Sequence, residues 1–112
     1  MLRRTTAALL LALALSALAG CASLRGARLY RSGTLALDRG DIEVAVADLE
    51  RAAALVPTAS EVQNHLGLAY AAAGRDADAR TAFRRAVDLD CGNTAASHNL
   101  QVAEQRAVGV RP

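Results

Sequence analysis

Residues 60–93 read SEVQNHLGLAYAAAGRDADARTAFRRAVDLDCGN, and this stretch decides the fold because it repeats the preceding stretch at an offset of 34 residues. The matching positions are small residues and large apolar residues, in the pairs Gly33 and Gly67, Gly40 and Gly74, Ala45 and Ala79, Leu49 and Phe83, Ala52 and Ala86, and Leu55 and Leu89. A fixed period of this length is typical of stacked supersecondary units. Arrays of such units usually bind other proteins through the surface they build together.

Apolar residues on both sides of the repeated glycines recur at helical spacing, and no stretch alternates as a strand would. The predicted helices cover residues 27–38, 42–55, 60–73, 76–90 and 94–107. Gly40 and Gly74 are expected to end the first helix of each unit, because glycine takes the left-handed conformation of a helix end at little cost. The fold class is therefore all-α.

Polar residues at the expected helix starts predict how each helix begins. Asp41 and Asp76 can cap the following helix or stabilise its N-terminus by charge. The run from Thr58 to Glu61 has the pattern of a capping box. Asn93 is expected to precede the last helix and to cap its N-terminus.

The second unit resembles the tetratricopeptide repeat, a helix-turn-helix motif with a period of 34 residues. The residues that carry the resemblance are Leu66, Gly67, Tyr70, Gly74, Ala79, Phe83 and Ala86. Gln63 and Cys91 depart from the pattern, where an aromatic residue and proline are usual. The resemblance implies an α-solenoid with repeats at about 26–59 and 60–93 and a capping helix at 94–107, together the domain 27–107. A generic antiparallel helical bundle is the alternative.

Repeats of this family bind ligands on a concave surface lined by the first helix of each unit. Carried over by register, the partner-binding residues would be Tyr30, Thr34, Leu37, Asn64, Leu68, Ala71, Ala72, His98, Val102 and Gln105. This largely apolar or small set suits an extended peptide or an amphipathic helix. Tyr30 and Thr34 stand where the basic carboxylate clamp of chaperone-binding relatives would have Lys and Asn, so that ligand is not expected. The alternative is a solvated face without a specific ligand.

The N-terminus is predicted to be a signal peptide, residues 1–20. Arg3 and Arg4 precede an apolar run of 13 residues, which is short against the about 20 residues that span a bilayer. Leu18-Ala19-Gly20-Cys21 resembles the lipobox of bacterial lipoproteins, which implies lipidation of Cys21. The short polar segment 21–26 is expected to be a tether, and residues 108–112 are expected to be a frayed tail. By the family's sorting rule, Ala22 and Ser23 imply the outer membrane, on its periplasmic face. An ordinary signal peptide with an incidental cysteine is the alternative.

Charge and composition exclude several function classes. The chain has 13 basic residues, all arginine, and without Arg3 and Arg4 the remaining eleven balance 11 carboxylates. A neutral domain lacks the basic surface that nucleic acid requires. His65 and His98 lie 33 apart, one short of the repeat, with no partners at a metal or nucleophile spacing, so we expect no metal, no cofactor and no enzyme activity.

Two other features stay open at this stage. Arg25, Arg28 and Arg31 could touch anionic headgroups or form a solvated helix face. Cys91 could form an intermolecular disulfide, although a packed thiol is the simpler expectation.

Together these features predict a membrane-anchored adaptor that binds another envelope protein. It resembles tetratricopeptide lipoproteins of pilus biogenesis, secretin piloting and envelope assembly. The alternative is a structural envelope lipoprotein that associates with itself and has no dedicated client.

Overall fold

The computed structural model describes residues 2–109, and within them the side chains of residues 5–17 and 20–109. The described part is helical without strands, as predicted. Its elements are α1 (Leu2–Arg39), α2 (Ile42–Leu55), α3 (Ser60–Ala72), α4 (Asp76–Leu89) and α5 (Thr94–Ala107). The bounds of α2 to α5 agree with the predicted ranges to within one residue. Residues 110–112 of the expected tail lie outside the described part.

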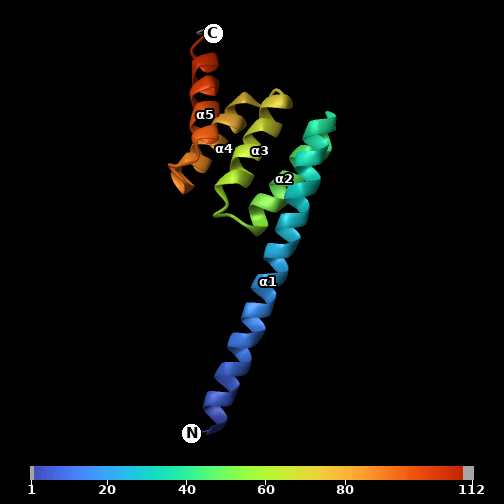
Figure 1. Ribbon diagram of the computed structural model, residues 1–112, viewed down its shortest axis with the longest axis vertical. Coiled ribbons are helices and arrows are strands. Elements are labelled where there is room, and N and C mark those ends of the chain that lie inside the picture. Colours follow the sequence, from blue (N-terminus) through green and yellow to red (C-terminus); the bar gives the residue numbers. More distant parts are fainter. Residues whose placement is uncertain (1, 110–112) are drawn as a thin grey trace.

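Successive helices alternate in direction and each packs against the next, from α1 to α5 (Figure 1). The first helices of successive units also touch, α1 against α3 and α3 against α5. The N-terminal half of α1 projects away from this layered domain, which is why the molecule measures 69 × 28 × 19 Å (Figure 1). The arrangement is that of an α-solenoid.

The two glycine turns repeat each other in conformation and in hydrogen bonding. Gly40 has φ 82° and Gly74 has φ 74°, as expected for glycines that end a helix. The amide that follows each glycine donates back over five residues, from Asp41 to the Ala36 carbonyl at 2.9 Å and from Arg75 to the Tyr70 carbonyl at 2.8 Å. Both turns therefore use the Schellman arrangement.

A glycine on the first helix of each unit faces a large side chain on the second helix. A Cβ on Gly33 would lie 2.6 Å from Cγ of Leu49, and one on Gly67 would lie 2.5 Å from Cδ1 of Phe83. The four repeated alanines that bring the helices together are also buried, namely Ala45, Ala52, Ala79 and Ala86. Leu49 shares a core cluster with Leu66 of the next unit, so it also fills the space between units.

The expected start of the first helix at residue 27 is wrong, because α1 is continuous from Leu2 to Arg39. The segment 21–26, predicted to be a tether, is helical, and Gly26 is buried with its Cβ position 3.2 Å from a methyl group of Val56. The physical reason is local: the alanine- and leucine-rich run favours helix, and no proline interrupts it before the domain begins.

The caps are only partly those predicted. The capping box at Thr58–Glu61 does not form, since Ala59 occupies the N-cap of α3 without a side-chain bond. The hydroxyl of Ser60 instead donates to the Ala86 carbonyl at 2.8 Å. Asp41 lies at the N-cap of α2 without bonding it, whereas Asn93 caps α5 by accepting from the amide of Ala96 at 3.0 Å.

Candidate functional site

The predicted partner-binding residues lie on α1, α3 and α5, the helices that would line a concave surface. Their exposure differs. Ala72, His98 and Gln105 are exposed, Asn64 is buried, and the partly buried residues are Tyr30, Thr34, Leu37, Leu68, Ala71 and Val102.

Three of these residues, Leu68, Ala71 and Val102, line one pocket of about 140 Å³ between α3, α4 and α5. We call it the α3–α5 pocket; its other lining residues are Asp76, Ala79, Phe83, Asn99, Ala103 and Arg106. Phe83 and Ala79 are buried, whereas Asp76 and Arg106 are exposed, so the pocket has apolar walls and a charged rim. The volume is below the about 300 Å³ at which small-molecule sites usually begin. It suits a protruding side chain.

The rest of the predicted surface is divided. Tyr30 lines a second hollow of about 470 Å³, beside Val56 and Ser60, and Ala72 lines a third of about 620 Å³, beside Glu50 and Arg75. The remaining predicted residues lie outside these three hollows, namely Thr34, Leu37, Asn64, His98 and Gln105. The structure therefore gathers part of the predicted set and separates the rest.

Polar contacts between the first helices follow the same 34-residue period as the core. The Tyr30 hydroxyl lies 3.2 Å from Nδ1 of His65, and the two rings meet edge to face with centroids 5.3 Å apart. One period later, Nδ2 of Asn99 donates to Oδ1 of Asn64 at 2.9 Å. Asn64 is only 6% exposed, so its side chain joins two helices and is not free to meet a ligand.

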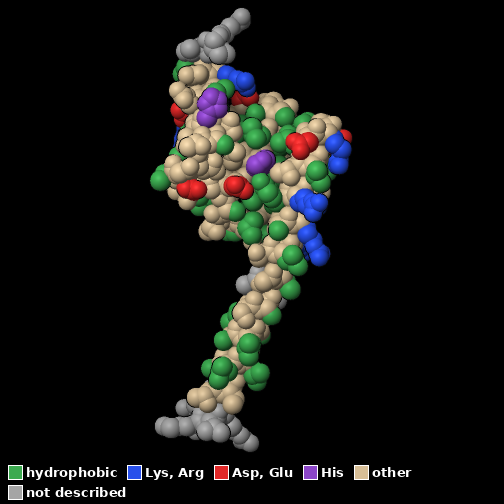
Figure 2. All heavy atoms as spheres, viewed as in Figure 1, with side chains coloured by type: hydrophobic (Ala, Val, Ile, Leu, Met, Phe, Trp, Pro, Cys, Tyr) green, Lys and Arg blue, Asp and Glu red, His purple; other side chains and the backbone are tan. Residues whose placement is uncertain are grey.

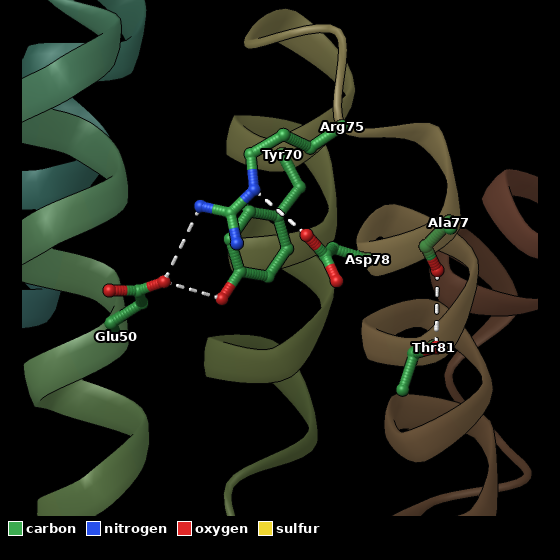
Figure 3. A network of polar contacts seen from close by, with 6 residues as sticks. All are labelled: Glu50, Tyr70, Arg75, Ala77, Asp78 and Thr81. Atoms are coloured by element: carbon green, nitrogen blue, oxygen red, sulfur yellow. Dashed lines mark hydrogen bonds and ion pairs between the residues drawn. The ribbon is translucent and has the colours of Figure 1, made fainter.

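A second polar network joins the units on their other side (Figure 3). The Tyr70 hydroxyl donates to Oε1 of Glu50 at 2.7 Å, and the guanidinium of Arg75 lies over the Tyr70 ring, 4.4 Å from its centroid. Nε of Arg75 also donates to Oδ2 of Asp78 at 2.8 Å. Burial, and then the hydrogen bond to Glu50, raise the pKa of Tyr70 to about 12.

Sequence reasoning missed this network because it treated Tyr70 only as part of the repeat pattern. Asn99 was missed as well, although it stands 34 residues after His65 and the period could have pointed to it. The partners of both side chains come from other helices, which the local sequence does not reveal.

The N-terminal part of α1 carries no charge between Thr5 and Leu24. Its described leucines are largely exposed, among them Leu9, Leu10, Leu11, Leu13, Leu15 and Leu24. Within the described residues, α1 is a helix long and apolar enough to cross a membrane by length and composition, a test that signal sequences also pass. The uncharged stretch from Thr5 to Leu24 is therefore longer than the 13-residue apolar run within it. A removed signal peptide and a retained membrane span can both have this length.

Cys21 is exposed on α1. The side chains of Leu18 and Ala19, within the lipobox-like motif, lie outside the described part. Cys91, expected to be packed, is exposed in the turn between α4 and α5, and neither cysteine forms a disulfide in this structure.

Paired helices, repeated glycine contacts and a regular period define this chain as a helical-repeat protein, a class that works by presenting stacked helix faces to other proteins. The tetratricopeptide repeat family model matches residues 30–96, more than half of the chain, and the chain belongs to the tetratricopeptide repeat family. Members of this family are generally non-catalytic interaction modules. A comparison with curated proteins finds no significant match.

Proposed function

We propose that this protein is a membrane-anchored adaptor that holds a protein partner at a bacterial envelope membrane. The observation that carries the binding half is the α3–α5 pocket, where Leu68 and Val102 from different first helices face the same space above Phe83. Family membership supports the same conclusion, since stacked helices of this kind present such surfaces to proteins.

The chemistry of the pocket favours one kind of ligand segment. Apolar walls accept a single leucine-like or aromatic side chain, and the exposed Asp76 and Arg106 at the rim can meet polar groups of the segment that carries it. Two units and a final helix present too little surface to enclose a long peptide. The proposed ligand is a short amphipathic helix or extended segment with one apolar anchor residue.

The proposed attachment to a membrane rests on the N-terminal sequence. The order of Arg3 and Arg4, an apolar run and Leu18-Ala19-Gly20-Cys21 supports export and lipidation of Cys21. Ala22 and Ser23 support retention in the outer membrane, with the domain in the periplasm. Acyl chains would anchor the protein stably, since two lipid signals already suffice for lasting attachment.

Site-specific photo-crosslinking in cells tests the binding half. A photoreactive residue at Leu68 or Val102 should trap a partner, whereas one at the exposed Thr81 on α4, outside the pocket, should not. Loss of the adduct when Ala71→Arg fills the pocket would tie the contact to this site. Adducts between two copies of this chain would favour self-association instead, and equal trapping at Thr81 would overturn the proposed site.

A further inference from the structure

Three arginines at the start of the domain form no ion pair with any described residue. Arg25, Arg28 and Arg31 are exposed, and they follow directly after the uncharged stretch that ends at Leu24. Three arginines further along the domain have acidic partners, Arg39 with Asp41, Arg75 with Glu50 and Asp78, and Arg84 with Glu104, whereas Arg51, Arg80, Arg85 and Arg106 are also without an ion pair to a described residue but lie far along the chain from the uncharged stretch. The three guanidinium groups, named here the basic collar, are therefore available to an anion from outside the chain.

The collar occupies one side of α1. At 100° per residue its three members fall within an arc of about 120°, on the side away from Gly33, which packs against Leu49. Arg28 and Arg31 also line a shallow hollow of about 310 Å³ with Leu35. Basic side chains follow the free edge of the molecule above its apolar segment (Figure 2).

The height of the collar matches the polar layer of a bilayer. A helical rise of 1.5 Å places Arg25, Arg28 and Arg31 about 1.5, 6 and 10.5 Å beyond Leu24 along the axis. The headgroup layer beyond the hydrocarbon core is about 5–7 Å thick on each side. Long arginine side chains extend toward that layer, so all three can reach lipid phosphates when the apolar stretch lies in the bilayer, or when α1 lies against the surface beside an acyl anchor at Cys21.

We infer that the basic collar binds the phosphate groups of anionic phospholipids and thereby fixes how the repeat domain lies against the membrane. This inference rests on the membrane attachment proposed above. Charge complementarity and the continuity of α1 with the apolar stretch favour a lipid over an acidic protein, because the collar begins one residue after that stretch ends. Each arginine near an anionic membrane surface strengthens binding to that membrane about fivefold.

The test uses the full chain in phosphatidylcholine vesicles that contain phosphatidylglycerol. Cys21 is kept, because its thiol carries the proposed acyl anchor and is therefore not labelled; Cys91→Ser removes the other native thiol, and Ala27→Cys places a fluorophore beside the collar at an exposed position. Brominated phosphatidylglycerol should quench this fluorophore more strongly than brominated phosphatidylcholine, and high salt should reduce the difference.

Two matched triple variants decide the outcome. Changing Arg25, Arg28 and Arg31 to glutamine should equalise quenching by the two lipids. The same change at Arg51, Arg80 and Arg85, which lie on the second helices, should leave the preference intact. The inference would be overturned if the two brominated lipids quenched the fluorophore equally while the collar is unchanged. It would also be overturned if brominated phosphatidylglycerol still quenched more strongly after the three collar arginines are changed to glutamine. A fluorophore that neither lipid quenches would contradict the membrane attachment itself and leave the collar to an acidic protein.

Discussion

The hydroxyl of Tyr30 lies 3.2 Å from Nδ1 of His65, and the two residues belong to the first helices of neighbouring units. The corresponding positions one period later are Asn64 and Asn99, which are joined by a hydrogen bond of 2.9 Å. The repeat thus preserves the place of an inter-helix polar contact while the residues that make it change. Each contact ties the first helix of one unit to the first helix of the next.

Removing one partner of the second contact should destabilise the domain. Asn99→Ala leaves the buried carbonyl of Asn64 without its donor, so the free energy of unfolding should fall by about 1–3 kcal/mol. Urea denaturation followed by circular dichroism measures the loss. Gln101→Ala, at an exposed position on the same helix, is the control. Equal stability of the two variants would contradict a structural role for this bond.

Adding a methyl group at Gly67, where the glycine of the second unit packs against Phe83, should destabilise the domain. Gly67→Ala places a methyl group against the ring of Phe83, and overpacking of this kind costs about 1–3 kcal/mol of unfolding free energy. Phe83→Leu in the same chain supplies the smaller partner found opposite Gly33 in the first unit. A double-mutant cycle should then give a loss smaller than the sum of the two single losses. Simple additivity would argue against the contact.

Stability should decline at alkaline pH because of the Tyr70 network. The folded pKa of Tyr70, about 12, is above its ordinary value of 10.0, so the folded state favours the protonated phenol. This contribution is fully present below pH 10 and is lost as the pH rises toward 12. Denaturant midpoints across this range should fall less in Tyr70→Phe than in the unchanged chain. Burial also raises the pKa of Tyr30, so both chains carry Tyr30→Phe to remove that contribution. An identical decline in the two chains would contradict the prediction.

Cys21→Ala tests the lipid anchor. Metabolic labelling with palmitate should disappear, and the unprocessed chain should accumulate, because the acceptor thiol is gone. Mass spectrometry of the unchanged protein should find acyl chains on a peptide that begins at Cys21. Membrane retention alone would not decide the matter, since the uncharged stretch from Thr5 to Leu24 can hold an uncleaved chain in a bilayer. Persistent labelling in the variant would contradict lipidation at this residue.

Much of the fold could be predicted because its signals are local. Gly40 and Gly74 mark their turns through a conformation that only glycine takes cheaply, and the period aligns Gly67 with Gly33. The failures involve contacts between distant segments. Ser60 belongs to a plausible capping box, but its hydroxyl instead donates to the carbonyl of Ala86 and accepts from the side-chain amide of Asn93.

The proposed binding surface was harder to predict for the same reason. Register assigned Leu68 and Val102 to the same predicted surface, and both line one pocket, but it could not reveal that Asn99 donates a hydrogen bond to the buried Asn64. Nor could it place the charged rim, because Asp76 and Arg106 reach the pocket from α4 and α5 only after the helices have packed.

The unbroken course of α1 has a mechanical consequence. A helix without proline, and without a break between its apolar part and the buried Gly26, transmits rotation instead of absorbing it at a hinge. Transmembrane helices tilt by about 20° on average to match the thickness of their bilayer. If the helix is kept whole in a membrane, such a tilt would swing the entire repeat domain with it, so that bilayer thickness would set the angle at which a partner meets the α3–α5 pocket.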